Sequence, residues 1–328
     1  MSAPEELLQA IVDAKSILIT THVAPDGDAI GSALALKIAL DRMGKGPRVG
    51  LSDPVPEFLR FLPEADSIET AECVGGPFDL ALVLDCGSLD RVGKCENAVV
   101  SSRKVANVDH HTTNTHFADI NWVDSEAAAT AQMAAGIIRD LGVEFDPDIA
   151  ACLFAGLSTD TGSFRYSNTS ADTFRVAAAL VDAGARPWEI AQNIYDTKPY
   201  KSLSALAEAI LGIQFSSGGL IASMEITAEM MERHGITESE TEGFIGYARS
   251  IEGVEVAVAF REVEDGLIRI GFRSKEKVDV AEIAAEYGGG GHVRASGCTV
   301  PGPLAEVKSN VISRLNRALA EAGYTWTE

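Results

Sequence analysis

The chain has 328 residues, enough for one large or two ordinary domains, and its 46% hydrophobic and 23% charged residues are typical of a soluble protein. No apolar run reaches the length of a membrane span, and the start lacks the features of a secretory signal. The five cysteines are scattered and form no CxxC pair, which argues against a disulfide framework and a thiolate zinc site and favours a reducing cytoplasm. The net charge of −21, from 48 acidic and 27 basic residues, disfavours long duplex nucleic acid, so a phosphate-bearing substrate should be small or be met by local arginines and cations.

The N-terminal half alternates short apolar strands with helical stretches. A helix over 4–13 precedes a buried strand over 16–20 and a helix over 29–40. Such alternation predicts an α/β domain, in which a parallel sheet is covered by helices on both faces. The further strands are predicted at 47–51, 67–70, 79–84, 103–108 and 120–123, and the further helices at 125–141, 147–157 and 170–183.

The C-terminal half is built differently. A helical pattern over 188–211, interrupted by Pro199, separates the halves, and we place a linker there between a domain of residues 1–187 and one of residues 212–328. In the second domain Asp265-Gly266 is a favoured hairpin turn. The elements predict a smaller α+β domain, with strands at 220–225, 254–260 and 267–272 and helices at 279–286 and 304–322.

A turn rich in acids connects the first strand to its helix. It reads His22-Val-Ala-Pro-Asp26-Gly-Asp28. Ligands bind at the carboxyl ends of the strands in such sheets, but a dinucleotide-binding turn would carry closely spaced glycines. Bare acids repel a pyrophosphate unless a cation lies between them, so the turn predicts a metal site. The alternative is that Asp28 only caps the helix and that His22 is an ordinary buried histidine.

Residues of the same type recur at the ends of later elements. Asp85 follows the strand at 79–84, Asp109-His110-His111 follows the strand at 103–108, and Asp160 follows the helix at 147–157. Carboxylate and imidazole without thiolate suit manganese, magnesium or a similar ion. The ligands are too many for one cation, and two metals about 3.5–4 Å apart would acidify a bridging water and stabilise both oxygens of a phosphoryl transfer.

A glycine-rich stretch in the C-terminal half is a candidate phosphate site. Backbone amides of such a loop can cradle a phosphate, and an arginine can bind one with a bidentate fork. A flexible linker with ordinary salt bridges is the alternative. The candidate substrate-binding residues are Gly289, Gly290, Gly291, His292, Arg294 and Ser296 in this stretch, with Arg273 and Arg165 elsewhere.

Together these residues resemble a known family. His22-x-x-x-Asp26-x-Asp28, Asp85, Asp109-His110-His111 and Thr159-Asp160-Thr161-Gly162 are similar to the four motifs of the DHH phosphoesterases. Gly288-Gly-Gly-Gly-His-Val-Arg-Ala-Ser-Gly297 resembles the hallmark of the DHH-associated domain of the first type. Five motifs in the expected order, and the chain length, favour the branch of nano-RNases and pAp phosphatases.

The resemblance implies a role for each residue of the four motifs. It implies that His22 and Asp26 bind one metal, that Asp28, His110 and Asp160 bind a second, and that Asp85 binds both. It makes Asp109 and His111 residues that orient the site or polarise the scissile phosphate. The implied catalytic residues are Asp85, Asp109, His110 and His111.

The resemblance also implies a function. It predicts a phosphodiesterase and phosphatase that uses two divalent ions, manganese first and magnesium or cobalt as alternatives, to hydrolyse short single-stranded oligonucleotides (nano-RNA) and pAp. The second domain would grip the terminal phosphate across a cleft, and the protein would form a homodimer. Alternative substrates are cyclic di-AMP and pApA. A manganese pyrophosphatase should lack the glycine–His–Arg stretch, and a non-catalytic nucleotide-binding protein should have damaged metal motifs.

Overall fold

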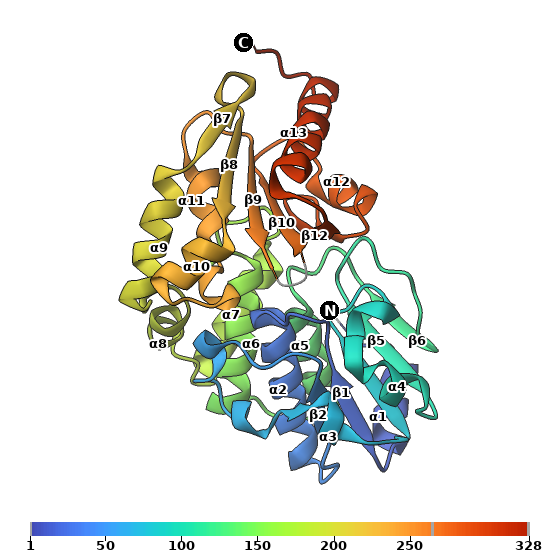
Figure 1. Ribbon diagram of the computed structural model, residues 1–328. Helices are drawn as coiled ribbons and strands as arrows, with labels where there is room; N and C mark the ends of the chain where they lie inside the picture. Colours follow the sequence, from blue (N-terminus) through green and yellow to red (C-terminus); the bar gives the residue numbers. More distant parts are fainter. Residues whose placement is uncertain (1, 264–265, 327–328) are drawn as a thin grey trace. The chain divides into compact units, whose positions relative to one another are not determined.

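Residues 2–263 and 266–326 are described in a computed structural model, in which the chain divides into the units Met1–Thr197 and Lys198–Glu328 (Figure 1). The boundary lies inside the stretch predicted as a linker. Helix α8 (Pro187–Ala191) and the π-helix η4 (Gln192–Asp196) pack on the core of the first unit through Ile190 and Ile194. Helix α9 (Tyr200–Leu211) packs into the second unit through Ala205, Leu206 and Ala209.

The first unit contains a six-stranded sheet in which every pairing is parallel, as predicted. Its strand order is β3-β2-β1-β4-β5-β6, so β1 and β4 are central neighbours. The carboxyl ends of all these strands therefore meet at one edge. The strands are β1 (Ile17–Thr20), β2 (Arg48–Leu51), β3 (Glu69–Thr70), β4 (Leu80–Leu84), β5 (Val105–Asp109) and β6 (Ile120–Val123).

Helices cover both faces of this sheet. Side chains alternate along a strand, so Leu80, Leu82 and Leu84 join one hydrophobic cluster while Ala81 and Val83 join another. The larger cluster is completed by α1 (Glu5–Asp13), α2 (Gly27–Arg42), α5 (Thr130–Asp140), α6 (Pro147–Asp160) and α7 (Ala171–Asp182). The smaller cluster is completed by α3 (Ala71–Val74), the 3₁₀-helix η3 (Leu89–Cys95) and α4 (Glu96–Val100).

Two helices begin elsewhere than the sequence suggests. Helix α2 begins at Gly27 and is capped by Asp26, whose side chain accepts the amides of Asp28 and Ala29, so Asp28 lies in the first helical turn. Helix α5 begins at Thr130, not at Ser125. Its N-terminal amides are capped from another helix, because Asp28 accepts Thr130 N at 2.6 Å and Ala131 N at 2.7 Å. A tertiary cap therefore replaces the expected local one.

Glycines allow α2, α5 and α6 to approach closely beside the sheet edge. A Cβ atom on Gly31 would lie 2.4 Å from the carbonyl oxygen of Cys152 on α6. A Cβ atom on Gly156 would lie 2.8 Å from Ala131 Cβ and 3.0 Å from Asp28 Oδ1. The position of Asp28 thus depends on glycine at both crossings.

The second unit has the predicted α+β character. Its mixed sheet has the order β11-β12-β10-β9-β8-β7, with only the β8–β9 pair parallel among the described strands. The strands are β7 (Gln214–Ser216), β8 (Ile221–Ile226), β9 (Val256–Glu262), β10 (Leu267–Ser274), β11 (Gly290–His292) and β12 (Ala295–Pro301). Asp265 of the predicted hairpin turn lies outside the described residues.

Helices pack on both faces of the second sheet as well. Helices α12 (Val280–Glu286) and α13 (Leu304–Glu321) share a core with β9 and β10. Helices α10 (Ala228–His234) and α11 (Phe244–Ser250) share another with α9 and β8. The glycine-rich stretch is not wholly a loop as expected, because three of its residues form strand β11 against β12.

Candidate metal centre and active site

The residues of the four predicted motifs gather at the carboxyl edge of the first sheet. His22 lies just beyond β1, Asp85 directly after β4, and Asp109 is the last residue of β5. Helices α2 and α6 bring Asp28 and Asp160 to the same place. We call the set the acidic–histidine cluster; its members are His22, Asp26, Asp28, Asp85, Asp109, His110, His111 and Asp160.

Backbone geometry fixes Asp85 at the centre of the cluster. Its φ of +54° is in the left-handed region, which costs a non-glycine residue about 1–3 kcal/mol and is concentrated at functional sites. Its carboxylate accepts the hydroxyl of Thr130 at 3.0 Å, and His22 Nε2 lies 3.5 Å from its other oxygen. The side chain is 2% exposed.

The tautomers of two histidines follow from their backbone partners. His22 Nδ1 lies 2.8 Å from the carbonyl oxygen of Val23, and His110 Nδ1 lies 3.1 Å from that of Ala127. A carbonyl oxygen can only accept, so Nδ1 carries the proton in each ring. In a neutral imidazole the lone pair is then on Nε2, and in both histidines this atom faces carboxylates.

His110 shows why the cluster suits a cation. Its Nε2 lies 3.2 Å from an oxygen of Asp160, 3.5 Å from one of Asp85 and 3.7 Å from one of Asp28. A lone pair facing several carboxylate oxygens is repelled unless a proton or a metal ion lies between them. The donor set of nitrogen and carboxylate oxygen is the one that manganese and related divalent ions accept.

The pKa directions agree with this picture. Burial, reinforced by the charges of Asp85 and Asp160, raises the pKa of Asp28 well above its usual range. Burial also opposes the charge on Asp85, yet the close contact with His22 and the positive charge of the nearby histidines hold its pKa below the ordinary value. The pKa values of His22, His110 and His111 are raised despite burial, because carboxylates surround them. The metal-free cluster therefore retains protons that a divalent ion would displace.

Within the first unit, three groupings of side-chain atoms are close enough to hold an ion. They join His22 with Asp26 and Asp85, Asp28 with His110 and Asp160, and Asp85 with Asp109 and His111, each with its atoms within 4.8 Å of one another. The acidic and histidine residues are thus clustered for metal binding. Asp85 belongs to two of the groupings.

Behind the cluster, amide side chains hold Asp109. His111 Nδ1 donates to Asp109 Oδ1 at 2.7 Å, and Asn114 donates to the other oxygen at 2.6 Å. Asn114 also donates to Asn107 at 2.8 Å, and Asn107 is fixed by the carbonyl oxygens of Val83 and Cys86. Motif reading missed Asn107 and Asn114, as it missed Thr130, because their contacts arise between separate elements.

The candidate residues of the second unit make mainly structural contacts. Arg294 donates to the backbone carbonyl oxygens of Val278 and Glu276, and the Ser296 hydroxyl donates to Val280 O. Arg273 donates to Phe272 O at 2.9 Å. In the pairing of β11 with β12, Gly290 lies opposite Gly297 and His292 lies opposite Ala295.

Two of the glycines in this stretch cannot carry a side chain. A Cβ atom on Gly289 would lie 2.1 Å from Gly297 O, and one on Gly291, whose φ is +138°, would lie 2.6 Å from Ala295 O. Hairpin geometry alone therefore explains glycine at both positions. In the first unit Arg165 is exposed and donates to Gly162 O at 2.6 Å, just beyond α6.

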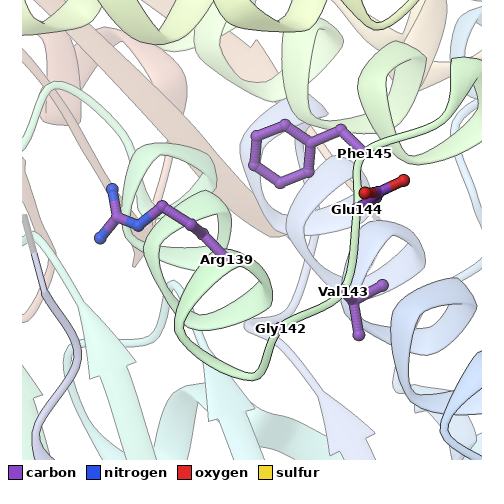
Figure 2. Close-up of a pocket in the computed structure, with 5 residues that line it drawn as sticks. All are labelled: Arg139, Gly142, Val143, Glu144 and Phe145. Carbon is purple, nitrogen blue, oxygen red and sulfur yellow. The ribbon is translucent and has the colours of Figure 1, made fainter.

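A surface pocket of about 340 Å³ lies away from the cluster. Figure 2 shows it where the chain leaves α5, lined by Arg139, Gly142, Val143, Glu144 and Phe145. The cluster adjoins the opposite end of this 11-residue helix, about 15 Å away at 1.5 Å per residue. The pocket includes none of the predicted site residues. Across the described part of the chain, the helices are too short or too polar to cross a membrane.

Comparison with known proteins gives matches over both units. Residues 16–157 match the model of the DHH family, N-terminal domain, and residues 220–321 match that of the DHHA1 domain. The chain is 37% identical over 320 residues to the bifunctional oligoribonuclease and PAP phosphatase NrnA of Thermus thermophilus, covering 97% of this chain and 94% of that protein. The enzyme of the same name from Bacillus subtilis is 30% identical, covering 90% and 92%.

A solved structure is also similar to this chain along its whole length. The exopolyphosphatase-related protein from Bacteroides fragilis is 25% identical, with a TM-score of 0.86 and coverage of 97% of this chain and 95% of that one. The likeness therefore extends over both units.

Proposed function

The chain belongs to the DHH family, and on that premise we propose that it is a phosphoric ester hydrolase acting on short oligoribonucleotides and on pAp. The observation that carries the proposal is the acidic–histidine cluster, in which Nε2 of His22 and Nε2 of His110 lie 3.2–3.7 Å from carboxylate oxygens. The names of the two similar enzymes support the substrate class.

We assign the cluster to two divalent ions, with manganese as the first candidate and magnesium or cobalt as alternatives. His22 and Asp26 would hold one ion, and Asp28, His110 and Asp160 the other, while Asp85 would contact both. When bound, such ions activate water and neutralise the negative charge that develops on a reacting phosphate. Water adds to phosphorus as the bond from phosphorus to the leaving oxygen breaks, and a proton passes to that oxygen.

The chain's own residues prepare the site for this reaction. Asp109 accepts His111 Nδ1–H, which fixes the ring and aims Nε2 away from Asp109. We assign Nε2 of His111 to the reacting phosphate, where a donor stabilises the developing charge. Thr130 fixes Asp85 with its hydroxyl and Asp28 with its backbone amide, so that two ligands keep their orientation before any ion binds.

We assign recognition of the substrate's terminal phosphate to the second unit. The residues are those of the glycine-rich stretch, Gly289, Gly290, Gly291, His292, Arg294 and Ser296, together with Arg273, and Arg165 from the first unit. The net charge of −21 favours short substrates over long strands. A cleft between the domains, a homodimer and a cytoplasmic location stay predictions.

The proposal is tested by hydrolysis of a panel of substrates with Mn²⁺, Mg²⁺ and Co²⁺. The panel contains 5′-phosphorylated RNA from dimers to decamers, pAp, cyclic di-AMP, pApA and pyrophosphate. Asp85→Asn should abolish turnover, whereas Asp66→Asn, at a residue 92% exposed in its side chain, should leave it unchanged.

Each outcome has a distinct meaning. Fast cleavage of dimers and trimers and of pAp, lost in Asp85→Asn, is the expected result. A preference for cyclic di-AMP or pApA would replace the substrate and keep the mechanism. Binding of nucleotides without hydrolysis of any ester in the panel would refute the proposed enzymatic activity and indicate a nucleotide-binding protein.

A further inference from the structure

Arg91 is a cation beside the acidic–histidine cluster that no motif of the chain includes. It lies in η3, between β4 and α4, and its side chain is exposed. Its Nη2 atom is 3.4 Å from His22 Nδ1, while His22 Nε2, on the other side of the ring, is 3.5 Å from Asp85. A single imidazole ring thus separates the guanidinium from the carboxylate at the centre of the cluster.

The contact between Arg91 and His22 is not a hydrogen bond. His22 Nδ1 already carries the proton that it donates to Val23 O at 2.8 Å, and every guanidinium nitrogen is a donor. Two donors that face each other form no bond. The guanidinium therefore lies beside His22 with its hydrogen-bonding capacity available for another group.

Arg91 also differs from most other arginines of its unit. Arg42, Arg48 and Arg139, for example, form ion pairs with Asp146, Glu69 and Asp140. Among the residues that the structure describes, no carboxylate forms an ion pair with Arg91. The chain has 48 acidic and only 27 basic residues, so an arginine beside the acidic–histidine cluster that forms no ion pair with a described carboxylate is a candidate to bind another kind of anion.

Local structure fixes the backbone of Arg91 against the histidine turn. The amide of Val23 donates to Arg91 O at 2.7 Å. Two residues later Gly93 has φ +63°, and a Cβ atom there would lie 2.5 Å from Val23 Cγ1 and 2.6 Å from Ser52 Oγ. Glycine at 93 lets η3 pack directly on the turn, so Arg91 is positioned by the fold.

We propose that Arg91 binds the non-bridging oxygens of the phosphate that reacts at the acidic–histidine cluster. A guanidinium offers a bidentate fork to phosphate and neutralises part of the charge that grows on its oxygens. This role rests on the proposed function, and it makes Arg91 a catalytic residue of the first unit. It also explains how an acidic protein holds a polyanionic substrate next to its own carboxylates.

The test compares Arg91→Gln and Arg91→Lys with the matched control Arg175→Gln, at an exposed arginine of α7. Calorimetry measures the binding of inorganic phosphate to the Mg²⁺-loaded protein, and kinetics measures hydrolysis of a 5′-phosphorylated diribonucleotide with Mn²⁺. Loss of a charged hydrogen bond should lower phosphate affinity by about 10-fold and kcat/KM by about 10- to 100-fold in Arg91→Gln, with Arg91→Lys between that variant and wild type. Mn²⁺ affinity and the melting temperature should match wild type.

The two measurements separate the proposals. Wild-type phosphate affinity in Arg91→Gln would overturn the role of Arg91, whether or not the protein hydrolyses oligonucleotides. A loss of Mn²⁺ affinity that parallels the loss of phosphate would also overturn it, because Arg91 would then act by supporting His22. Arg91-dependent phosphate binding without any hydrolysis by the wild type would keep the role of Arg91 and refute the proposed activity.

Discussion

Gly31→Ala tests the link between helix packing and the metal centre. The new Cβ atom would lie 2.4 Å from Cys152 O, a backbone atom that cannot rotate away, so α2 and α6 must separate. Alanine in place of a helical glycine contributes about 0.5–1 kcal/mol of stability, whereas overpacking costs about 1–3 kcal/mol. Because the atom in contact belongs to the backbone, we take the upper half of the overpacking range and expect the free energy of unfolding to fall by about 1–2 kcal/mol in total.

The packing defect should also reach the site. Asp28 lies one helical turn before Gly31, and Asp160 is the last residue of α6, so separation of the helices pulls apart two residues of the same ligand grouping. We expect the melting temperature of the first unit to fall by about 2–8 °C, and Mn²⁺ affinity to fall with it. Calorimetry measures both quantities.

The control is the same substitution at Gly246 in α11. Nothing lies within 4 Å of a Cβ atom there, so Gly246→Ala should stabilise the second unit by about 0.5–1 kcal/mol. Stabilisation by Gly31→Ala of the size seen for Gly246→Ala would refute the close crossing of α2 and α6. Destabilisation with unchanged Mn²⁺ affinity would refute the coupling to the cluster.

Three further outcomes follow from the cluster. Mn²⁺ affinity, measured by calorimetry, should fall at least about tenfold from pH 8 to pH 6, because protons compete with the ion for His22 and His110 as the pH falls through the raised pKa values of these two ligands. An affinity that does not change with pH would contradict the ligand assignment. Asn114→Ala removes a hydrogen-bond donor from Asp109 and should lower kcat about tenfold or more, with little change in KM, in steady-state kinetics. An unaltered kcat would exclude a positioning role for Asn114. Mn²⁺ at 100 times its Kd should raise the free energy of unfolding of the wild-type protein by about 2.7 kcal/mol and leave that of Asp85→Asn unchanged. If Mn²⁺ shifts the melting temperature of both proteins equally, the ion binds elsewhere.

The strands and motifs of the first unit could be predicted because each depends on local sequence. An apolar run that ends in an acid, such as residues 80–84 before Asp85, indicates both a buried strand and a side chain at its carboxyl end. Parallel topology then brings such ends together. The direction of the sheet and the α+β character of the second unit followed from the same patterns.

The parts that could not be predicted depend on contacts between distant residues. The start of α5 is set by Asp28, 102 residues away from Thr130, so Ser125 was a misleading cap. The contact of Arg91 with His22 spans 69 residues and leaves no pattern in the sequence. Strand β11 was missed because glycine disfavours strands, and only its pairing with β12 makes it one.

The buried carboxylates give the metal centre a role in the fold itself. Asp28 and Asp109 are 0% exposed, and burial of an ionised carboxylate is costly unless a cation or several donors compensate it. For Asp109 the compensation comes from Asn114 and His111. For Asp28 it comes from the amides of α5, while burial, together with the nearby charges of Asp85 and Asp160, raises the pKa of this carboxyl. Since that repulsion is removed when a cation lies among the three carboxylates, ion binding and the junction of α2 with α5 must stabilise each other.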